Sequence, residues 1–358
     1  MAVLQATDIP DLVATTLNNL GRLKATDLMS TYQNTIFYKR MMKKGKARPQ
    51  EGGTESEFNL ITGTNDSARG VGLYYVANVD PSDVMATGKM PWRHQTWNWG
   101  IERREIAMNA PSANKIVDLI KTRRMAAFGG AVLYFEQKGW RCPASTNTTD
   151  FMGIPYWIVK SGTATTTNDG FNGSVPSGYT TVANIDPTAV GITPKWNNYA
   201  APYTDVSAAD LVPEMERMSD MTYFMPLVDD GMPSYDTGED YGYYMGRTVR
   251  QGLKEILKAQ NQDLGFDLDP VGDKLAFRRA PMVWVKELDL DTTGVIYAIY
   301  WGTFGWQYLK GENLKETHIA YHSNQPTVSA THTDNTGNTF CTDRRRNGVL
   351  STGTTMPA

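Results

Sequence analysis

The sequence predicts a mixed α+β chain, and three observations lead to that class. Apolar residues recur at three- and four-residue spacing over 112–130 and again over 240–262, which is the pattern of amphipathic helices. Short runs of β-branched and aromatic residues near the C-terminal end are typical of strands. Glycines interrupt β-prone pieces over 47–89, which predicts a long two-stranded ribbon. A chain of 358 residues allows two or three domains.

The glycine-rich ribbon is the first extended element. Its turns and joints are expected at five glycines: Gly52, Gly53, Gly70, Gly72 and Gly88. An isolated hairpin is at best marginally stable in water, because it has little core of its own. We therefore expect the ribbon to lie against another chain.

Two helices follow the ribbon. The first begins after Ser112, a possible N-cap behind Pro111, and is expected to end at Gly129 and Gly130. The second covers 240–262 and is closed by Gly265. The intervening 144–184 is rich in Thr, Asn, Gly and Ser, which predicts surface loops or short strands.

Apolar runs after the second helix predict strands at 281–285, 294–301 and 318–321. No internal repeat of fixed period is visible, which argues against a solenoid or propeller.

The net charge of −3 conceals an uneven distribution. Residues 1–50 carry eight Lys and Arg against three Asp, a balance of +5, whereas 150–240 carries three basic and 13 acidic residues, a balance of −10. A strongly basic, dedicated nucleic-acid binder is excluded by the near-neutral total. The broad acidic segment is more typical of a solvated face than of an ion site.

Catalytic signatures are missing from the sequence. There is no Walker loop, dinucleotide-binding glycine motif, nucleophile elbow, zinc-protease motif or C-x-x-C pair. His318 and His322 fall in a predicted strand, where a spacing of four separates them by about 13 Å, so we expect no metal site there. We expect no enzymatic activity and no cofactor.

Two acidic stretches imitate calcium loops. Asp267 and Asp289 each begin one, but the twelfth position is Arg278 in the first and Tyr300 in the second, where a glutamate is required. Both are expected to be turns. Cys142 follows Arg141, which could lower its thiol pKa, yet no histidine base adjoins it, so an inert thiol is favoured.

Only two cysteines are present, which excludes a disulfide-stapled secreted fold. No apolar run reaches the ~18 residues that span a bilayer, and acidic residues stand where a signal peptide would be basic and apolar. We expect neither a membrane segment nor export.

Two parts of the chain resemble the major capsid proteins of tailed bacteriophages, which share the Hong Kong 97-type fold. The first is Trp92 to Arg124, with a tryptophan-containing strand, Asn109 ahead of the long helix and the helix core Ile116 to Leu119. The second is the last eighty residues, including the closing Arg344-Arg345-Arg346-Asn347-Gly348. The order of elements resembles that family over nearly the whole chain.

The resemblance implies a domain plan for a Hong Kong 97-like capsid fold. An N-terminal arm would cover 1–46 and an extended loop 47–89. A peripheral domain would cover 90–140, with its spine helix at 112–130. An axial domain would cover 141–285, and 286–358 would return to the peripheral domain as strands and the C-terminus.

The function implied is a major capsid protein that assembles into the hexamers and pentamers of an icosahedral phage head around double-stranded DNA. Partners would be other copies of the chain, portal and scaffold proteins, decoration proteins in some cases, and DNA through nonspecific contact. The protein would be made in the cytoplasm of the bacterial host and reside in the virion. Residues expected at contacts between subunits are Lys39, Arg40, Lys43, Lys44, Lys46, Arg48, Phe58, Tyr74 and Tyr75.

We expect the acidic 150–240 to face outward or around the symmetry axes, and the basic 39–48 to face inward or between subunits, because an acidic wall repels packaged DNA. Two alternatives remain open. One is the shell of an encapsulin-like cellular nanocompartment with an enzyme cargo. The other is a Thr/Asn-rich β-structured binding domain or hydrolase, which would be a monomer with a defined cleft.

Overall fold

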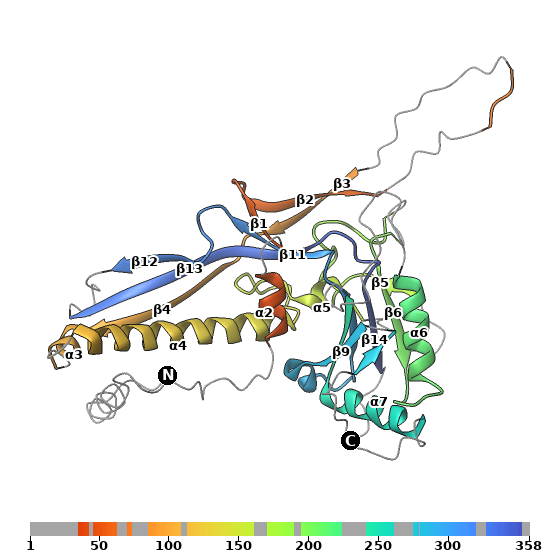
Figure 1. The fold of residues 1–358 in the computed structure, drawn as a ribbon. Helices are drawn as coiled ribbons and strands as arrows, with labels where there is room; N and C mark the ends of the chain where they lie inside the picture. Colours follow the sequence, from red (N-terminus) through yellow and green to blue (C-terminus); the bar gives the residue numbers. More distant parts are fainter. Residues whose placement is uncertain are drawn as a thin grey trace.

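A computed structural model describes most of the chain. The described residues are 35–42, 46–62, 70–73, 85–108, 113–160, 170–189, 195–223, 241–260, 275–278, 280–319 and 327–352. Figure 1 shows two parts, an elongated layer of long strands over one long helix and a more upright block of strands flanked by helices. Among the described residues, no helix is both long and apolar enough to cross a membrane.

The elongated layer is organised around one long strand, β13 (Val328–Cys341). Its first half pairs antiparallel with β4 (His94–Glu102) on one side and with β12 (Lys315–Ile319) on the other. Its second half pairs antiparallel with β11 (Phe304–Leu309), which pairs parallel with β1 (Ala47–Gln50). Strands from both ends of the chain therefore share this sheet.

The long helix α4 (Ala113–Gly139) runs along β4 and is preceded by α3 (Arg103–Met108). The expected end at Gly129 and Gly130 is wrong, because the helix continues for nine residues beyond Gly130. Packing explains the continuation: Phe135 and Glu136 on the last turns are buried against the short helix α2 (Ile36–Met41) and the sheet. Tertiary contacts here outweigh the low helix propensity of glycine.

The upright block contains a seven-stranded sheet with the order β5-β6-β14-β10-β7-β9-β8. Its strands are β5 (Gly170–Gly173), β6 (Asn198–Tyr203), β7 (Tyr241–Met245), β8 (Ala276–Phe277), β9 (Ala280–Trp284), β10 (Ile296–Tyr300) and β14 (Gly348–Thr352). The strands predicted at 281–285 and 294–301 are confirmed, and 315–319 forms a strand next to the predicted 318–321.

Two predictions about this block are corrected. The helix expected over 240–262 begins only at Arg247, as α7 (Arg247–Gln260), because Tyr241–Met245 forms a fully buried central strand. We expected 286–358 to return to the peripheral domain as strands, but β10 and β14 of this segment pair inside the seven-stranded sheet. Aromatic residues that are buried on both faces favour a strand over a helix at 241–245.

Two hydrophobic clusters hold the molecule together. One lies under α6 (Leu211–Thr222) and α7, which contribute Leu211, Met215, Val249 and Leu253 to one face of the seven-stranded sheet. The other lies where the two parts of the molecule meet, and it joins α2, the end of α4, the short helix α5 (Ile154–Trp157) and strands from both sheets. A 3₁₀ helix, Lys286–Leu290, connects β9 to β10.

The predicted ribbon exists as β2 (Glu55–Ile61) paired antiparallel with β3 (Met85–Pro91). The two strands form a separate sheet that projects from the upper side of the molecule in Figure 1. The residues 63–69 and 74–84, which include two of the predicted contact residues, lie outside the described part of the chain.

Candidate inter-subunit surfaces

The base of the ribbon is anchored in its own chain through Phe58. Its ring lies across Gly88 on the partner strand, where a Cβ would overlap the ring, with two further ring carbons at only 2.6 and 2.9 Å. Ring centroids of Trp157, Trp196 and Phe340 lie 6.2, 6.5 and 6.1 Å from that of Phe58. Phe58, which we expected at a contact between subunits, therefore packs inside its own subunit.

A network of side-chain amides sets the direction in which the ribbon leaves the subunit. Gln307 Nε2 donates to Gln50 Oε1 at 2.6 Å, and Gln50 Nε2 donates to the carbonyl oxygens of Gly52 and Glu55 at 2.7 and 2.9 Å. Ser56 Oγ donates to Gln307 Oε1 at 2.7 Å. The turn between β1 and β2 is thus tied to β11, so the ribbon has a defined root.

Beyond this root, the ribbon exposes apolar side chains. Ile61 and Met85 stand opposite each other at the end of the paired stretch and are 63% and 58% exposed. Farther out, Val71 is exposed and Leu73 is 93% exposed. Exposed large apolar groups that gather on one element mark an interaction surface. Tyr74 and Tyr75 lie outside the described residues.

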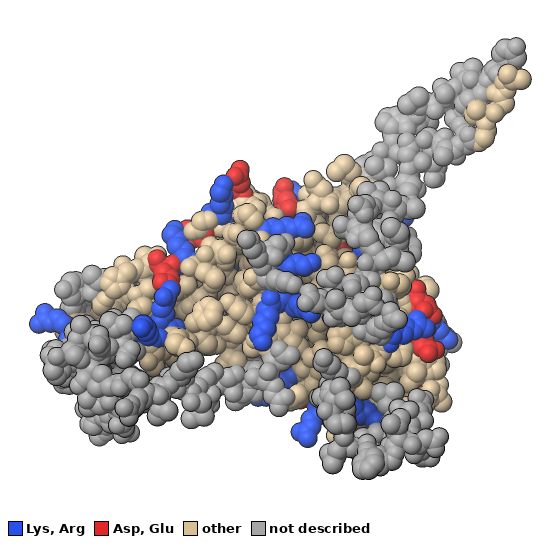
Figure 2. All heavy atoms as spheres, viewed as in Figure 1, with Lys and Arg blue, Asp and Glu red and all other residues tan. Residues whose placement is uncertain are grey.

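The four described basic residues that we expected to contact neighbours have different surroundings within the subunit. Lys46 Nζ donates to the carbonyl oxygen of Trp301 at 2.9 Å, and the Arg48 guanidinium lies 5.2 Å from the centre of the Phe340 ring. On α2, Lys39 is exposed and Arg40 is half-buried. Lys43 and Lys44 lie outside the described residues. Lys and Arg side chains are scattered over the face seen in Figure 2.

The helix α2 is attached to α4 by a buried carboxylate that the sequence did not single out. Glu136 Oε1 accepts hydrogen bonds from the backbone N–H groups of Ile36 and Phe37 at 3.1 and 3.2 Å, and Oε2 accepts one from Tyr38 at 3.1 Å. Trp140 Nε1 donates to Oε1 at 2.8 Å. Burial raises the pKa of Glu136, while these four donors act in the opposite direction.

The C-terminal segment that carried the family resemblance contains a buried arginine. Arg344 donates to the carbonyl oxygens of Trp157, Trp196 and Gly173 at 2.7, 2.5 and 3.0 Å, and to Asn198 Oδ1 at 3.2 Å. Burial lowers the pKa of Arg344 to about 10. One guanidinium thereby ties together the end of α5, the end of β5 and the turn before β6, which is a structural role.

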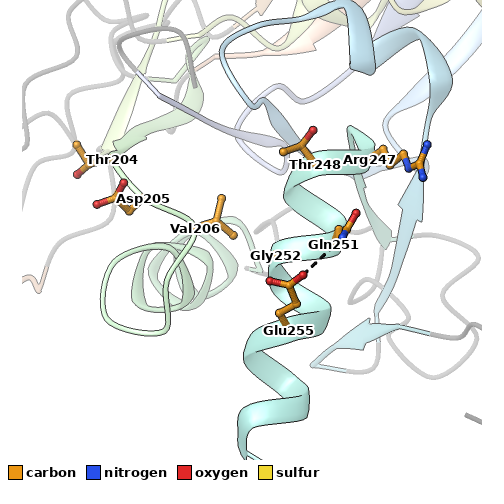
Figure 3. A pocket seen from close by; sticks show the side chains of 8 residues that line it. All are labelled: Thr204, Asp205, Val206, Arg247, Thr248, Gln251, Gly252 and Glu255. Atoms are coloured by element: carbon orange, nitrogen blue, oxygen red, sulfur yellow. Dashed lines mark hydrogen bonds between the residues drawn. The ribbon is translucent and has the colours of Figure 1, made fainter. Parts of the chain in front are cut away.

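Figure 3 shows a shallow groove between α7 and the turn that follows β6. Asp205 and Val206 line one side, and Arg247, Gln251 and Glu255 of α7 line the other. Gln251 Nε2 lies 3.5 Å from Glu255 Oε1, and a Cβ at Gly252 would lie 2.6 Å from Val206 Cγ1.

Many acids of the 150–240 segment are engaged within the subunit. Asp150 Oδ2 accepts from Lys138 Nζ at 2.8 Å, Asp210 Oδ2 accepts from two backbone N–H groups of the turn after β6, and Asp220 pairs with Arg278. Asp205 is exposed. The orientation of this segment in an assembly stays a prediction.

The structure gives the expected turn for the second candidate calcium loop. Asp289 accepts from Trp284 Nε1 and from the backbone N–H of Arg247, and Asp291 pairs with Lys160. Asp267 lies outside the described residues. Over the described residues, no three His, Cys, Asp or Glu side chains gather to hold a metal.

The surroundings of Cys142 and Cys341 disfavour the reactive thiolate form. Burial raises the pKa of Cys142 to about 11 and that of Cys341 to about 12. Arg141, which we considered as an activator of Cys142, instead pairs with Glu287 at 2.8 Å.

No protein-family model and no curated protein matches this chain in sequence. Solved structures do match it along nearly its whole length. A chain of the cyanophage A-1(L) capsid asymmetric unit aligns with a TM-score of 0.60 at 10% identity, covering 94% of this chain and 98% of the other. A chain from the capsid of a native GTA particle aligns with a TM-score of 0.57 at 10% identity, covering 99% and 100%.

A third match is a chain of the mature capsid of bacteriophage PhiM1, with a TM-score of 0.50 at 8% identity, covering 94% and 92%. The chain has the fold of a phage capsid subunit. The mixed α+β capsid fold that the resemblance implied is thus confirmed. Because each alignment covers both chains nearly to their full length, the elongated layer with its long helix and the upright block both take part in the likeness.

Proposed function

We propose that this protein is the major capsid protein of a tailed phage, which assembles with copies of itself into hexamers and pentamers of an icosahedral head around double-stranded DNA. The observation that carries the proposal is the full-length match to capsid chains, with a TM-score up to 0.60 among those described here. The protein acts through packing geometry and not through catalysis.

The exposed end of the ribbon supports self-assembly. Ile61, Met85 and Leu73 project apolar surface that their own subunit does not cover. Burying an exposed aliphatic side chain at an interface contributes about 1.5–3 kcal/mol. Each subunit contacts several neighbours, so many modest interfaces sum to a stable closed shell.

Portal, scaffold and decoration proteins and the packaged DNA are further proposed partners, and the virion is the proposed location. The DNA contact would be nonspecific, through phosphate and basic side chains such as the exposed Lys39 and Arg48. In the assembled head, the acidic 150–240 would face outward or around the axes.

The ribbon provides the test. In the variant Ile61→Asp/Met85→Asp, a charge replaces apolar surface at the end of the paired strands, so we expect capsomers and shells to be lost while the subunit stays folded. The control is Thr54→Asp, which places a charge at an exposed position at the root of the ribbon. Sedimentation velocity measures the assembly state, and thermal unfolding confirms the fold.

Assembly of the double variant at the wild-type level would contradict the role of the ribbon. The contents of purified particles test the capsid function itself. Particles that enclose DNA when the packaging machinery is supplied support it, whereas particles that enclose a protein cargo and no DNA favour a nanocompartment.

A further inference from the structure

The middle of α4 has an apolar face that the described elements cover only at one end, where α2 reaches Phe128. Met125 is 68% exposed and Phe128 is 44% exposed, and all but two of the side chains from 121 to 130 are classed as exposed. Met125 and Phe128 are three positions apart, and Gly129 follows Met125 by four, so the three lie on one side of the helix. We call the surface formed by Met125, Phe128 and Gly129 the open face of α4.

Gly129 is an unfavourable residue in the interior of a 27-residue helix. Among the described residues, its own subunit does not require it, because a Cβ at this position would meet nothing within 4 Å. Glycine in such a place permits the close approach of another backbone. The open face therefore has the shape expected where a further segment of chain lies directly on the helix.

The short helix α2 already occupies the C-terminal continuation of this face. The Tyr38 ring packs on Phe128 and Phe135, with centroid distances of 6.1 and 6.0 Å. The carboxylate of Glu136 holds the backbone N–H groups at the start of α2. The chain therefore enters α2 beside α4, within a few helical turns of the open face.

The chain before α2 comprises residues 1–34, which lie outside the described part. Their sequence carries apolar residues at three- and four-residue spacing, which is the pattern that covers an apolar face. These residues are Ile9, Leu12, Val13, Leu17, Leu20 and Leu23. Acidic residues at 8 and 11 lie at the far end of this pattern, and the exposed Lys121 lies at the far end of the open face.

The length of the 9–24 segment also matches the length of α4 that it would cover. A helical segment over 9–24 would be about 24 Å long, and the distance along α4 from 136 back to 121 is about 22 Å at 1.5 Å per residue. Residues 25–34 suffice to connect the two. A parallel run of 9–24 alongside α4, with residue 24 near 136 and residue 9 near 121, would place the acidic end of the segment beside Lys121.

We propose that residues 9–24 dock on the open face of α4 of the same subunit, with Leu12, Leu17 and Leu20 covering Met125 and Gly129. Glu136 fixes the root of this arm by holding α2. The inference does not rest on shell formation, because both partners belong to one subunit.

Two glycine variants test the docking. Gly129→Gln places a long polar side chain on the open face, whereas Gly130→Gln places the same side chain one position on, turned by about 100°. Both glycines have open space around them, and glutamine is the better helix former, so both variants should fold. Hydrogen exchange of the full-length protein measures the amides of 9–24.

We expect amides in 9–24 to be protected in the wild type and in Gly130→Gln, and to exchange at least tenfold faster in Gly129→Gln. Unprotected amides in the wild type, or equal exchange in the two variants, would overturn the proposal.

A disulfide measures the contact directly. In a Cys142→Ser background, Leu12→Cys is combined with Met125→Cys, or with the control Ala126→Cys, which is also exposed but is turned by about 100° from Met125 around the helix. A crosslink within one chain that forms at least fivefold faster with Met125→Cys supports docking. Equal rates, or a crosslink formed only between two chains, would contradict docking in the same subunit.

Discussion

Gly88→Ala tests whether the ribbon is anchored within its own subunit. The new Cβ would overlap the Phe58 ring, which is itself confined by Trp157 and Trp196. Overpacking of this kind costs about 1–3 kcal/mol, while alanine in a strand regains about 0.5 kcal/mol over glycine. We therefore expect a net loss of roughly 1–2 kcal/mol in the free energy of unfolding, measured by urea denaturation of the unassembled subunit.

A double-mutant cycle isolates the cause. In a Phe58→Leu background the aromatic ring is absent, so Gly88→Ala should cost less than about 0.5 kcal/mol, which gives a coupling energy near 1 kcal/mol. Gly52→Ala, in the turn between β1 and β2, is the control, because a Cβ there meets nothing within 4 Å. A full penalty that persists without the ring, or one seen only in assembled particles, would refute the intrachain anchor.

Three further predictions concern stability and reactivity. Burial alone would raise the pKa of Asp150, but hydrogen bonds, foremost the one from Lys138, lower it. The stabilisation by Asp150 is therefore present above the unfolded pKa near 4 and is lost as pH falls below that value. The thermal midpoint of Asp150→Asn should accordingly change less between about pH 4 and 2 than that of the wild type, and an equal change in both proteins would contradict this. Arg123→Met breaks a bidentate ion pair with Glu105, at 2.7 and 2.9 Å, and should lower the free energy of unfolding in urea by about 2 kcal/mol. A loss below about 0.5 kcal/mol would show that the pair contributes little to stability. Cys142, with its pKa near 11, should react with iodoacetamide at pH 8 at least tenfold more slowly than a free thiol, and rapid labelling of the native protein would disprove its burial.

Local sequence patterns predicted those helices and strands whose formation depends mainly on their own residues. The start of the long helix, the ribbon strands and the strand at 296–300 follow from apolar spacing and glycine placement. The helix end at Gly129 and Gly130 was wrong because packing farther along the helix decides where it stops. At 241–245, the spacing of apolar residues also fits a helix, but burial within the sheet favours a strand.

Contacts between distant residues could not be predicted from local sequence. Glu136 holds residues about one hundred positions away, and Arg344 holds carbonyl groups up to 187 positions away. Nothing in the neighbourhood of either residue signals its partner. Phe58 illustrates the same limit, because its local sequence did not signal that the half-buried ring packs against Trp157 and the core of its own subunit.

Electron microscopy of the purified protein, expressed with its scaffold, tests the central claim most directly. Closed icosahedral shells, or rings of five and six subunits, are the predicted result, because the fold matches capsid chains over nearly its full length. A strictly monodisperse monomer under these conditions would contradict a capsid function for this chain.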